Sequence, residues 1–538
     1  MRGFTGNPFV DAGIAGMCAA AGVDNPEQLD MAAIRRAVDV LYQILLSDSA
    51  FVDRKPYKVF ATSTMAMLFP NSPLPQVGFP TPDIKRQKYR ERVDELVGFL
   101  VQGAISDADV ACFACGQPAH MYVGIDRFPL VGSSNQLLNF HPLLGKGHPV
   151  CAFCALAVQF LPLAVMQTKA EGGRLWFIHT ADPSLAVTVA REYGVSHLQR
   201  LVAAGEPLRF AGTWACPGEN GAVVSLLSEL GTGQHARLLE QTRYPVSAIM
   251  FSNDNREQFI KRIPVPHQLI EFFNVLQQYA DAAGRFENEL LRSPAGSSIA
   301  GRMLAAEPII ALCMRHDEQQ LLGGWELHRL YAQEVLGMNT KYIHTVQEVA
   351  GRLVTDERGK KTLNALKQVR DVEAFNVLLD MVRDGWITRQ QLHLLSPPGE
   401  AYLAGQARDY LLGAAYALQH GEQLGDLREE EEQAEAEHPL VASIERVGNG
   451  LSAAIDEAKR LVGSLRQAQR PQEIRRAFLR LIATGHLRWQ DFLFFCPPDD
   501  ANRHYQSRDY WLAFLYDRFR REFAREEASI EQSISQEV

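Results

Sequence analysis

The chain has 538 residues, enough for two to four domains at the usual size of about 100–200 residues each. Hydrophobic residues make up 46% of it and charged residues 22%, so there is ample material for packed cores. The formal net charge of −9 excludes a surface that is basic throughout, so binding to nucleic acid would have to come from local patches.

The start of the chain and its longest apolar run argue against export and membrane insertion. Asn7, Pro8 and Asp11 interrupt the apolar core that a secretory signal would need. The apolar run 150–166 is shorter than the roughly 20 residues of a spanning helix, so a buried helix is expected there. Four of the eight cysteines are scattered singly, which is typical of a reducing compartment. We expect a cytoplasmic protein without a membrane partner.

Residues 1–300 are predicted to form an α+β domain. A helix should begin after Asn7, which can cap it with Pro8 at the first helical position. Gly13 and Gly16 would let another element approach that helix closely. Short β-like runs, separated by loops rich in proline and glycine, begin near residues 60, 121, 174, 246 and 259.

From about residue 300 the pattern becomes helical, because glycine and proline thin out and apolar residues fall three and four positions apart. We predict a helical region over 301–427 and a C-terminal all-α helical bundle over 440–538. The acidic run 428–439 is predicted to be a solvated helix end or linker, the alternative being an interaction tail.

The helical part contains a repeat with a constant offset of 100 residues. The recurring pairs include Gly385/Gly485, Gln390/Gln490, Pro397/Pro497, Asp409/Asp509 and Tyr410/Tyr510. An offset without gaps predicts an internal duplication, with the first copy in 301–427 and the second in 440–538.

The two copies differ in charge. Residues 365–416 carry five Lys/Arg against six Asp/Glu, a net of −1, whereas residues 465–516 carry eight against five, a net of +3. The second copy is therefore the better candidate to face a polyanion. The arginines expected to contact a nucleic-acid strand there are Arg475, Arg476, Arg480 and Arg488.

Two Cys-x-x-Cys pairs, Cys112/Cys115 and Cys151/Cys154, predict a metal site. Zinc takes four soft ligands in a tetrahedron, and each pair can supply two. A closed shell of four thiolates leaves no position for water, so we expect structural Zn²⁺ in a zinc-ribbon-like element over about 106–160. A thioredoxin-like site needs only one such pair. Coincidental buried cysteines remain an alternative, and the nearby histidines that could replace a cysteine are His120, His141 and His148.

The stretch between the pairs could approach phosphates or base edges closely. Short polar side chains and glycine allow such an approach, and an amide and a cation add specific contacts. The candidates for contact with target DNA are Gly132, Ser133, Ser134, Asn135, Asn139 and Lys146. An ordinary polar turn is an equally good interpretation of these residue types.

A basic run at 83–92 adds further DNA-contact candidates, Lys85, Arg86 and Lys88, together with Asn71 in the preceding loop. A solvated helix face explains this run at least as well. We find no phosphate-binding loop, zinc-protease motif, nucleophile elbow or dinucleotide fingerprint, which favours binding over catalysis.

Several stretches together resemble the CXXC–CXXC large subunit of type I-B CRISPR Cascade complexes. The resemblance covers roughly residues 1–270. It rests on FTGNPFVDAGIAGM at the start, FPNS at 69–72, the cysteine pairs flanking RFPLVGSSN and NFHP, and AIMFSNDN before IPVP.

The resemblance implies a non-catalytic subunit of an antiviral, RNA-guided complex. Such a subunit binds the 5′ handle of the guide RNA, recognises the protospacer-adjacent motif on double-stranded DNA and aids R-loop formation, while guide pairing supplies sequence specificity. It also implies Cascade backbone and small subunits as partners, and recruitment of a helicase-nuclease or a transposition adaptor. The second helical copy would be small-subunit-like.

Two rival interpretations remain open. One is a zinc-dependent nucleic-acid-processing enzyme, which would need an open metal position and a general base; neither cysteine pair has the H-x-E partner of a deaminase. The other is a zinc-ribbon scaffold without a nucleic-acid role.

Overall fold

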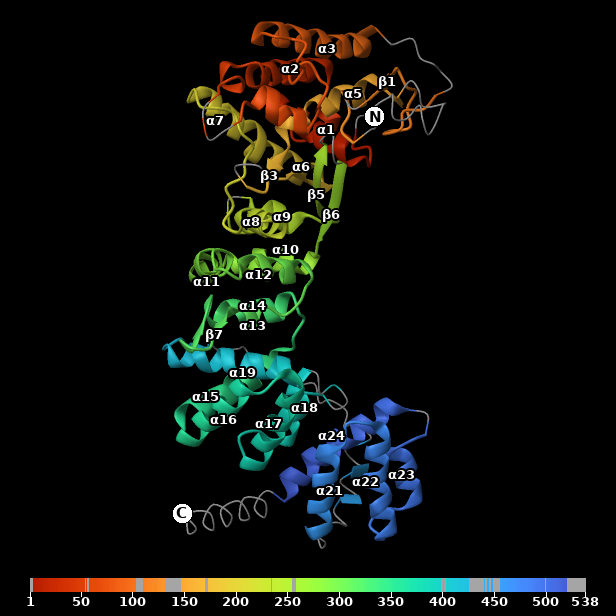
Figure 1. Cartoon of the computed structure of the whole chain (residues 1–538), viewed down its shortest axis with the longest axis vertical. Helices are drawn as coiled ribbons and strands as arrows, with labels where there is room; N and C mark the ends of the chain where they lie inside the picture. The colour runs from red at the N-terminus through yellow and green to blue at the C-terminus, as the bar shows by residue number, and fades with distance from the viewer. Residues whose placement is uncertain are drawn as a thin grey trace. The chain divides into compact units, whose positions relative to one another are not determined.

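The computed structural model describes residues 3–53, 55, 58–102, 110–124, 126–130, 147–169, 173–233, 235–253, 258–397, 400, 403–424, 440, 443–444, 447–448, 455–498 and 500–519. The chain divides into two compact units, Met1–Glu307 and Pro308–Val538. Helices make up most of both units, and only a small part of the described chain is sheet (Figure 1).

The first unit combines helices with small antiparallel sheets. Its principal elements are α1 (Pro8–Ala21), α2 (Met31–Leu45), α3 (Pro82–Gln102), β1 (Met121–Val123), β2 (His148–Val150), α5 (Ala152–Gln159), β3 (Met166–Gln167), β4 (Leu175–Thr180), α6 (Pro183–Val189), α7 (His197–Ala203), α8 (Glu219–Thr232), α9 (Ala236–Gln241), β5 (Val246–Asn253), β6 (Gln258–Val265), α10 (His267–Leu276), α11 (Ala280–Arg285) and α12 (Gly296–Leu304).

The larger sheet has the strand order β3-β4-β5-β6, and every neighbouring pair is antiparallel. In its register Phe177 of β4 lies opposite Ile249 of β5. Phe9 of α1 packs edge-on against Phe177 and Phe251, so α1 covers one face of this sheet. The predicted strands that begin near residues 174, 246 and 259 are confirmed as β4, β5 and β6.

Helix α1 is the centre of the first core. Asn7 caps it by accepting hydrogen bonds from the amides of Phe9 and Val10, as predicted. A Cβ atom at Gly13 would lie 2.2 Å from the carbonyl oxygen of Ala157, so the backbones of α1 and α5 meet without a side chain between them. The expectation that these glycines allow a close approach is confirmed.

The prediction of a strand near residue 60 is wrong. Phe60–Thr64 is a helical turn, and the ring of Phe60 is buried against Phe210 at 5.0 Å between centroids. Its β-branched and aromatic composition favours a strand, but the chain here turns so that Phe60 can enter the core. The apolar run 150–166 does contain a buried helix, α5. Within the described parts of the chain, no helix is both long and apolar enough to cross a membrane.

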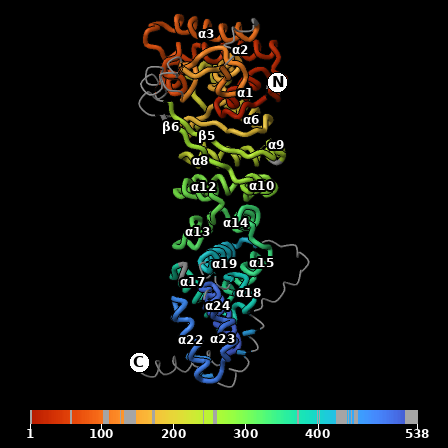
Figure 2. The backbone as a smooth tube through the Cα atoms, turned by 90° about the vertical axis from the view of Figure 1, so that its right-hand side faces the viewer, coloured from red at the N-terminus to blue at the C-terminus, as the bar shows by residue number. Residues whose placement is uncertain are grey.

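The second unit is built from helices and one short hairpin. Its elements are α13 (Ile310–Cys313), β7 (Met314–Arg315), β8 (Gln320–Leu321), α14 (Gly324–Glu334), α15 (Thr340–Thr355), α16 (Glu357–Gln368), α17 (Asp371–Asp384), α18 (Arg389–Leu395), α19 (Leu403–Gln419), α21 (Ile455–Gln467), α22 (Pro471–Ala483), α23 (Trp489–Phe495) and α24 (Ala501–Arg518). Figure 2 shows α22, α23 and α24 grouped within it.

We predict that Gly13→Ala destabilises the chain. The added methyl group would overlap the α5 backbone, and overpacking of this kind costs about 1–3 kcal/mol. Urea unfolding monitored by circular dichroism measures the change in the free energy of unfolding. Gly98→Ala in α3 is the matched control, because no atom lies within 4 Å of its added Cβ. This control should be neutral or stabilising by about 0.5–1 kcal/mol, and an equal effect of the two substitutions would contradict the packing argument.

Candidate metal centre

The first cysteine pair lies in a tight turn. The amide of Cys112 donates to the carbonyl oxygen of Gln117 at 2.6 Å, and the amide of Gly116 donates back to the carbonyl oxygen of Cys112 at 2.9 Å. Gly116 has φ +73°, a conformation that glycine adopts without a steric penalty. This turn directs the sulfur atoms of Cys112 and Cys115 to one side.

The second pair is positioned by a strand and a helix start. Strand β2 pairs antiparallel with β1, and Cys151 follows directly as the N-cap of α5. The sulfur of Cys151 accepts a hydrogen bond from the amide of Cys154 at 3.4 Å. Gly147, at the start of this segment, lies so close to β1 that a Cβ atom would be 2.5 Å from the carbonyl oxygen of Val123.

The four sulfur atoms converge, although 35 residues separate Cys115 from Cys151. All four lie within 4.8 Å of one another, and those of Cys115 and Cys151 are 3.6 Å apart. Cys112, Cys151 and Cys154 are buried, and Cys115 is partly exposed. In a tetrahedron with Zn–S bonds of about 2.3 Å the sulfurs lie about 3.8 Å apart, so the cluster fits a four-thiolate metal ion.

Hydrogen bonds among three of the cysteines shift their pKa values in opposite directions. Hydrogen bonds from Cys151 and Cys154 stabilise the thiolate of Cys112 and lower its pKa. The same bond to Cys112 raises the pKa of Cys151 to about 12, and the pKa of Cys154 is also raised by donation to Cys112. Because metal ions bind thiolates, a bound cation would have to displace the protons of Cys151 and Cys154.

The neighbouring histidines have other roles in the structure. The Nδ1 atom of His120 accepts a hydrogen bond from the amide of Ala152 at 2.9 Å. His148 lies in β2, with its ring against Phe113. His141 is outside the described residues. Among those described, the group of potential ligands at this point comprises the four cysteines.

The stretch expected to contact DNA lies outside the described residues, but both of its ends are described. This applies to Gly132, Ser133, Ser134, Asn135, Asn139 and Lys146. Before it, Asp126 pairs with Arg92 of α3 at 3.2 Å, and the side chain of Gln159 donates to the carbonyl oxygen of Arg127 at 3.2 Å. After it comes β2. Both ends are therefore attached to the same core as the cysteines.

Asn253, at the end of β5, is a residue whose role the sequence did not reveal. Its side chain is fully buried; Oδ1 accepts from the amide of Leu130 at 3.3 Å, and Nδ2 donates to the carbonyl oxygen of Leu68 at 2.7 Å. One amide thus joins β5 to the segment before FPNS and to the segment that leads into the cysteine-flanked stretch. In the sequence, only its position in the stretch AIMFSNDN pointed to Asn253 as a residue of interest.

The basic run of α3 is largely committed to contacts within the chain. Lys85 is only 8% exposed, and its ammonium donates to the carbonyl oxygens of Leu74 and Gln76. It therefore holds the loop before α3 and is not a surface cation. Arg86 pairs with Asp48 and Asp83, and Lys88 pairs with Glu91. Asn71 is exposed in the loop. Contact of Arg86, Lys88 and Asn71 with DNA stays a prediction.

The C-terminal arginines are more exposed to solvent than Lys85. The Arg488 side chain is 87% exposed, and Arg476 and Arg480 are also exposed. The guanidinium of Arg475 lies over the ring of Phe492 at 5.4 Å. These residues share α22 and the start of α23.

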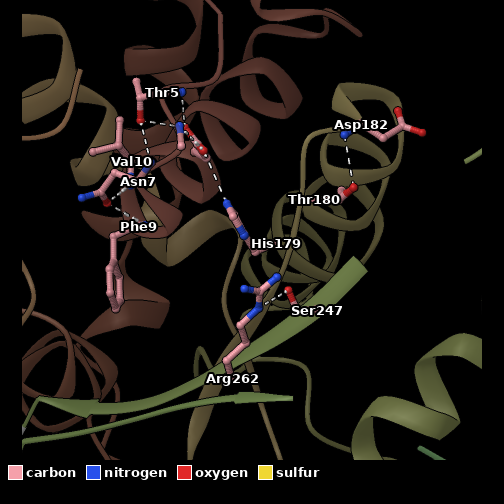
Figure 3. A network of polar contacts seen from close by, with 11 residues as sticks. Thr5, Asn7, Phe9, Val10, His179, Thr180, Asp182, Ser247 and Arg262 are labelled. Carbon is pink, nitrogen blue, oxygen red and sulfur yellow. Dashed lines mark hydrogen bonds and ion pairs between the residues drawn. The ribbon is translucent and has the colours of Figure 1, made fainter. Parts of the chain in front are cut away.

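A second polar network joins the start of the chain to the sheet (Figure 3). The buried carboxylate of Asp11 accepts hydrogen bonds from the amide and hydroxyl of Thr5 and from the amide of Gly6, at 2.6–3.0 Å. His179 of β4 lies 3.5 Å away on the other side. Figure 3 also shows Arg262, which donates a hydrogen bond to the hydroxyl of Ser247 at 3.1 Å. Asp11 and His179 lie 168 positions apart in the sequence, so local spacing could not predict their contact.

Comparisons with protein-family models, curated proteins and solved structures gave no match for this chain.

We predict that Cys154→Ala abolishes binding of one metal ion per chain. Elemental analysis of the purified protein measures this, with zinc the expected ion. Loss of the cross-link should lower the free energy of unfolding by about 2–4 kcal/mol, as for other links that close long loops. Cys496→Ser is the matched control, since Cys496 is also buried and the position 100 residues earlier is Ser396. The site would be contradicted if the wild-type protein were purified without bound metal and Cys154→Ala had the same free energy of unfolding as the wild type.

We also predict that Asn253→Ala lowers the free energy of unfolding by about 1–3 kcal/mol, because the buried carbonyl of Leu68 and the partly buried amide of Leu130 lose their side-chain partner. Hydrogen exchange at the amide of Leu130 should increase, because that N–H loses its acceptor. Asn288→Ala is the control, because that side chain is exposed and bonds only within its own helical turn, to the carbonyl oxygen of Gly284. Unchanged exchange at Leu130 together with unchanged stability would show that Asn253 does not join the segments.

Proposed function

We propose that this chain is the non-catalytic large subunit of a type I-B Cascade complex. The observation that carries the proposal is the convergence of two distant Cys-x-x-Cys turns into one cluster with all sulfur atoms within 4.8 Å. A four-thiolate shell around Zn²⁺ has no open position for a reacting water, so the ion would be structural and would hold a zinc-ribbon-like element. This supports a binding role over a metal-dependent hydrolase.

The packing of the first unit supports a common site for the stretches that resemble the family. The amide of Asn253 bonds to the residue before FPNS and to Leu130 of RFPLVGSSN. The cysteines hold the chain on both sides of the same stretch. The cysteine-flanked stretch would read the protospacer-adjacent motif on double-stranded DNA, next to the bound 5′ handle of the guide RNA.

The remaining roles follow from the resemblance. Motif binding would start R-loop formation, and guide pairing would supply sequence specificity. Backbone and small subunits would share the RNA contacts, which suits a chain with a net charge of −9. The second helical copy, produced by internal duplication, would be small-subunit-like. A helicase-nuclease or a transposition adaptor would be recruited to the assembled complex.

The proposal is tested by expressing the full chain together with the genes that neighbour its own and isolating the complex through this chain. We expect a guide RNA with a repeat-derived 5′ end, zinc, and binding of target duplex that depends on a short adjacent motif. Affinity should fall steeply with added salt because phosphate contacts release counterions. The purified chain should not cleave the duplex.

The double variant Cys151→Ser/Cys154→Ser should lose at least about tenfold in affinity for the motif-bearing duplex, whereas Cys496→Ser should not. The tenfold figure corresponds to about 1.4 kcal/mol, roughly the discrimination of one good base contact. A complex without RNA, or binding that ignores the adjacent motif, would contradict the proposal. Metal-dependent cleavage by the chain alone would favour the enzyme alternative.

A further inference from the structure

A π-helical segment interrupts one helix of the first unit. Helix α6 ends at Val189, the π-helical segment Ala190–Ser196 follows, and α7 begins at His197. Such segments are rare and are frequently found at functional sites. Gly194 lets this one pack directly on the neighbouring backbone, because a side chain there would overlap the carbonyl group of Leu163. The widened turn is therefore fixed in place beside a cavity.

The cavity has a volume of about 330 Å³, which is at the lower end of the range for small-molecule sites. Residues from α7 and the π-helical segment, from α8, and from the start of α9 form it, so it brings together distant parts of the sequence. None of its residues belongs to the cysteine cluster. The polar side chains that line it are Glu192, Tyr193, His197, Arg200, Glu229 and His235.

Tyr193 and Glu229 form the shortest polar contact of the cavity. The hydroxyl of Tyr193 donates to Oε2 of Glu229 at 2.8 Å. Burial raises the pKa of Tyr193, so its hydroxyl keeps the proton and remains a donor. The ring of Tyr193 lies 6.0 Å from that of Trp214, whose Nε1 donates to the carbonyl oxygen of Gln167. Within the described parts of the chain, Oε1 of Glu229 has no hydrogen-bond donor, so this oxygen can accept from a ligand.

The negative charge of Glu229 is incompletely compensated. Its pKa is raised; burial of the carboxyl group is the largest cause, although the residue as a whole is exposed. The charge of Glu287 adds to this shift, whereas the hydrogen bond from Tyr193 opposes it. Glu287 itself pairs with Arg292 at 2.7 Å. A cation bound beside Glu229 would stabilise its ionised form.

The other lining groups add acceptors and leave the cavity negative. Glu192 makes only a long contact, 4.0 Å, to Nε2 of His235. His197 lies with Nε2 3.1 Å from the carbonyl oxygen of Arg209, which can only accept, so Nε2 carries the proton. Burial lowers the pKa of His197, and its ring is therefore neutral at pH 7. Two carboxylates against the one guanidinium of Arg200 give the lining a net negative charge.

The lining selects against anions and against a bare metal ion. A phosphate or carboxylate ligand would be repelled by the two glutamates. In the part of the chain that the structure describes, the cysteines are the group of potential ligands that converges closely enough for a metal ion. The acceptors of this cavity lie farther apart. They suit an organic cation that can reach Glu192 on the π-helical segment and Glu229 on α8 at the same time.

We propose that this cavity binds a guanidinium group, with the carboxylates of Glu192 and Glu229 as its acceptors. A guanidinium is planar and always charged, and its five N–H donors allow one group to bond two carboxylates on different elements. It also stacks on aromatic rings, and Tyr193 supplies one. An ammonium is a compact, strongly hydrated charge and suits separated acceptors less well. Two sources carry the guanidinium: a free arginine-like compound and an arginine side chain of a partner protein.

The test is calorimetric titration of the full chain with agmatine, which carries a guanidinium and no carboxylate. Putrescine is the matched ligand, because an ammonium replaces the guanidinium, and it should bind at least about tenfold more weakly. Glu229→Gln and Glu192→Gln keep the size of each side chain and remove its charge. Each should weaken agmatine binding about 10- to 100-fold, as expected for loss of a charged hydrogen bond.

The control variant is Glu271→Gln. Glu271 is an exposed glutamate of the first unit that lies 3.5 Å from His267, a contact like that of Glu192 with His235, and it does not line the cavity. Its substitution should leave the affinity for agmatine unchanged. None of the three substitutions should change the thermal unfolding midpoint, since each replaces one side chain by another of the same size.

The peptide acetyl-Gly-Arg-Gly-amide distinguishes the two sources. Tighter binding of agmatine than of the peptide identifies a free ligand, and peptide binding at least as tight as that of agmatine identifies an arginine of a partner protein. The inference is overturned if neither probe binds at millimolar concentration, if putrescine binds as tightly as agmatine, or if both glutamine variants bind agmatine like the wild type. It uses neither the cysteine cluster nor nucleic acid, so it stands or falls separately from the proposed function.

Discussion

The close approach of four cysteine sulfurs is the constraint on which the first unit depends. Two turns separated by 35 residues bring four sulfur atoms within 4.8 Å of one another. Hydrogen bonds from Cys151 and Cys154 lower the pKa of Cys112, and donation to Cys112 raises the pKa of Cys151 and Cys154. This arrangement is compatible with a metal site, and a bound ion would accept all four sulfurs and close the loop between the two pairs.

The surroundings of the cluster show how such a loop is attached to the core. Arg92 and Asn253 hold the chain before it, and the β1–β2 pairing holds the chain after it. The same core includes α5, whose first residues carry the second cysteine pair and whose backbone packs directly on α1 at Gly13. The cysteine cluster, α1 and the β3-β4-β5-β6 sheet therefore share one hydrophobic core.

The second unit shows how one local structure can present two different faces. Helices α17 and α22 have the same caps and the same terminal glycine, so their backbones start and end alike. The side chains decide the outcome: Asp380 pairs with Arg466 and its face is buried, whereas Arg480 and Trp489 leave their face open to solvent. Exchange of a carboxylate for a guanidinium is enough to change what such a face can contact.

The sequence by itself determined the features that arise from neighbouring residues. Asn7 and Pro8 start α1, and short, mostly apolar runs form β4 and β5. The two Cys-x-x-Cys pairs predict a common metal site, and their sulfur atoms lie together. Only the tertiary structure decided the role of Asn253, the burial of Lys85, the helical turn at Phe60 and the exposure of Trp489. Caps, turns and periodic patterns depend on residues a few positions apart, whereas burial and long-range hydrogen bonds depend on which distant segments pack together.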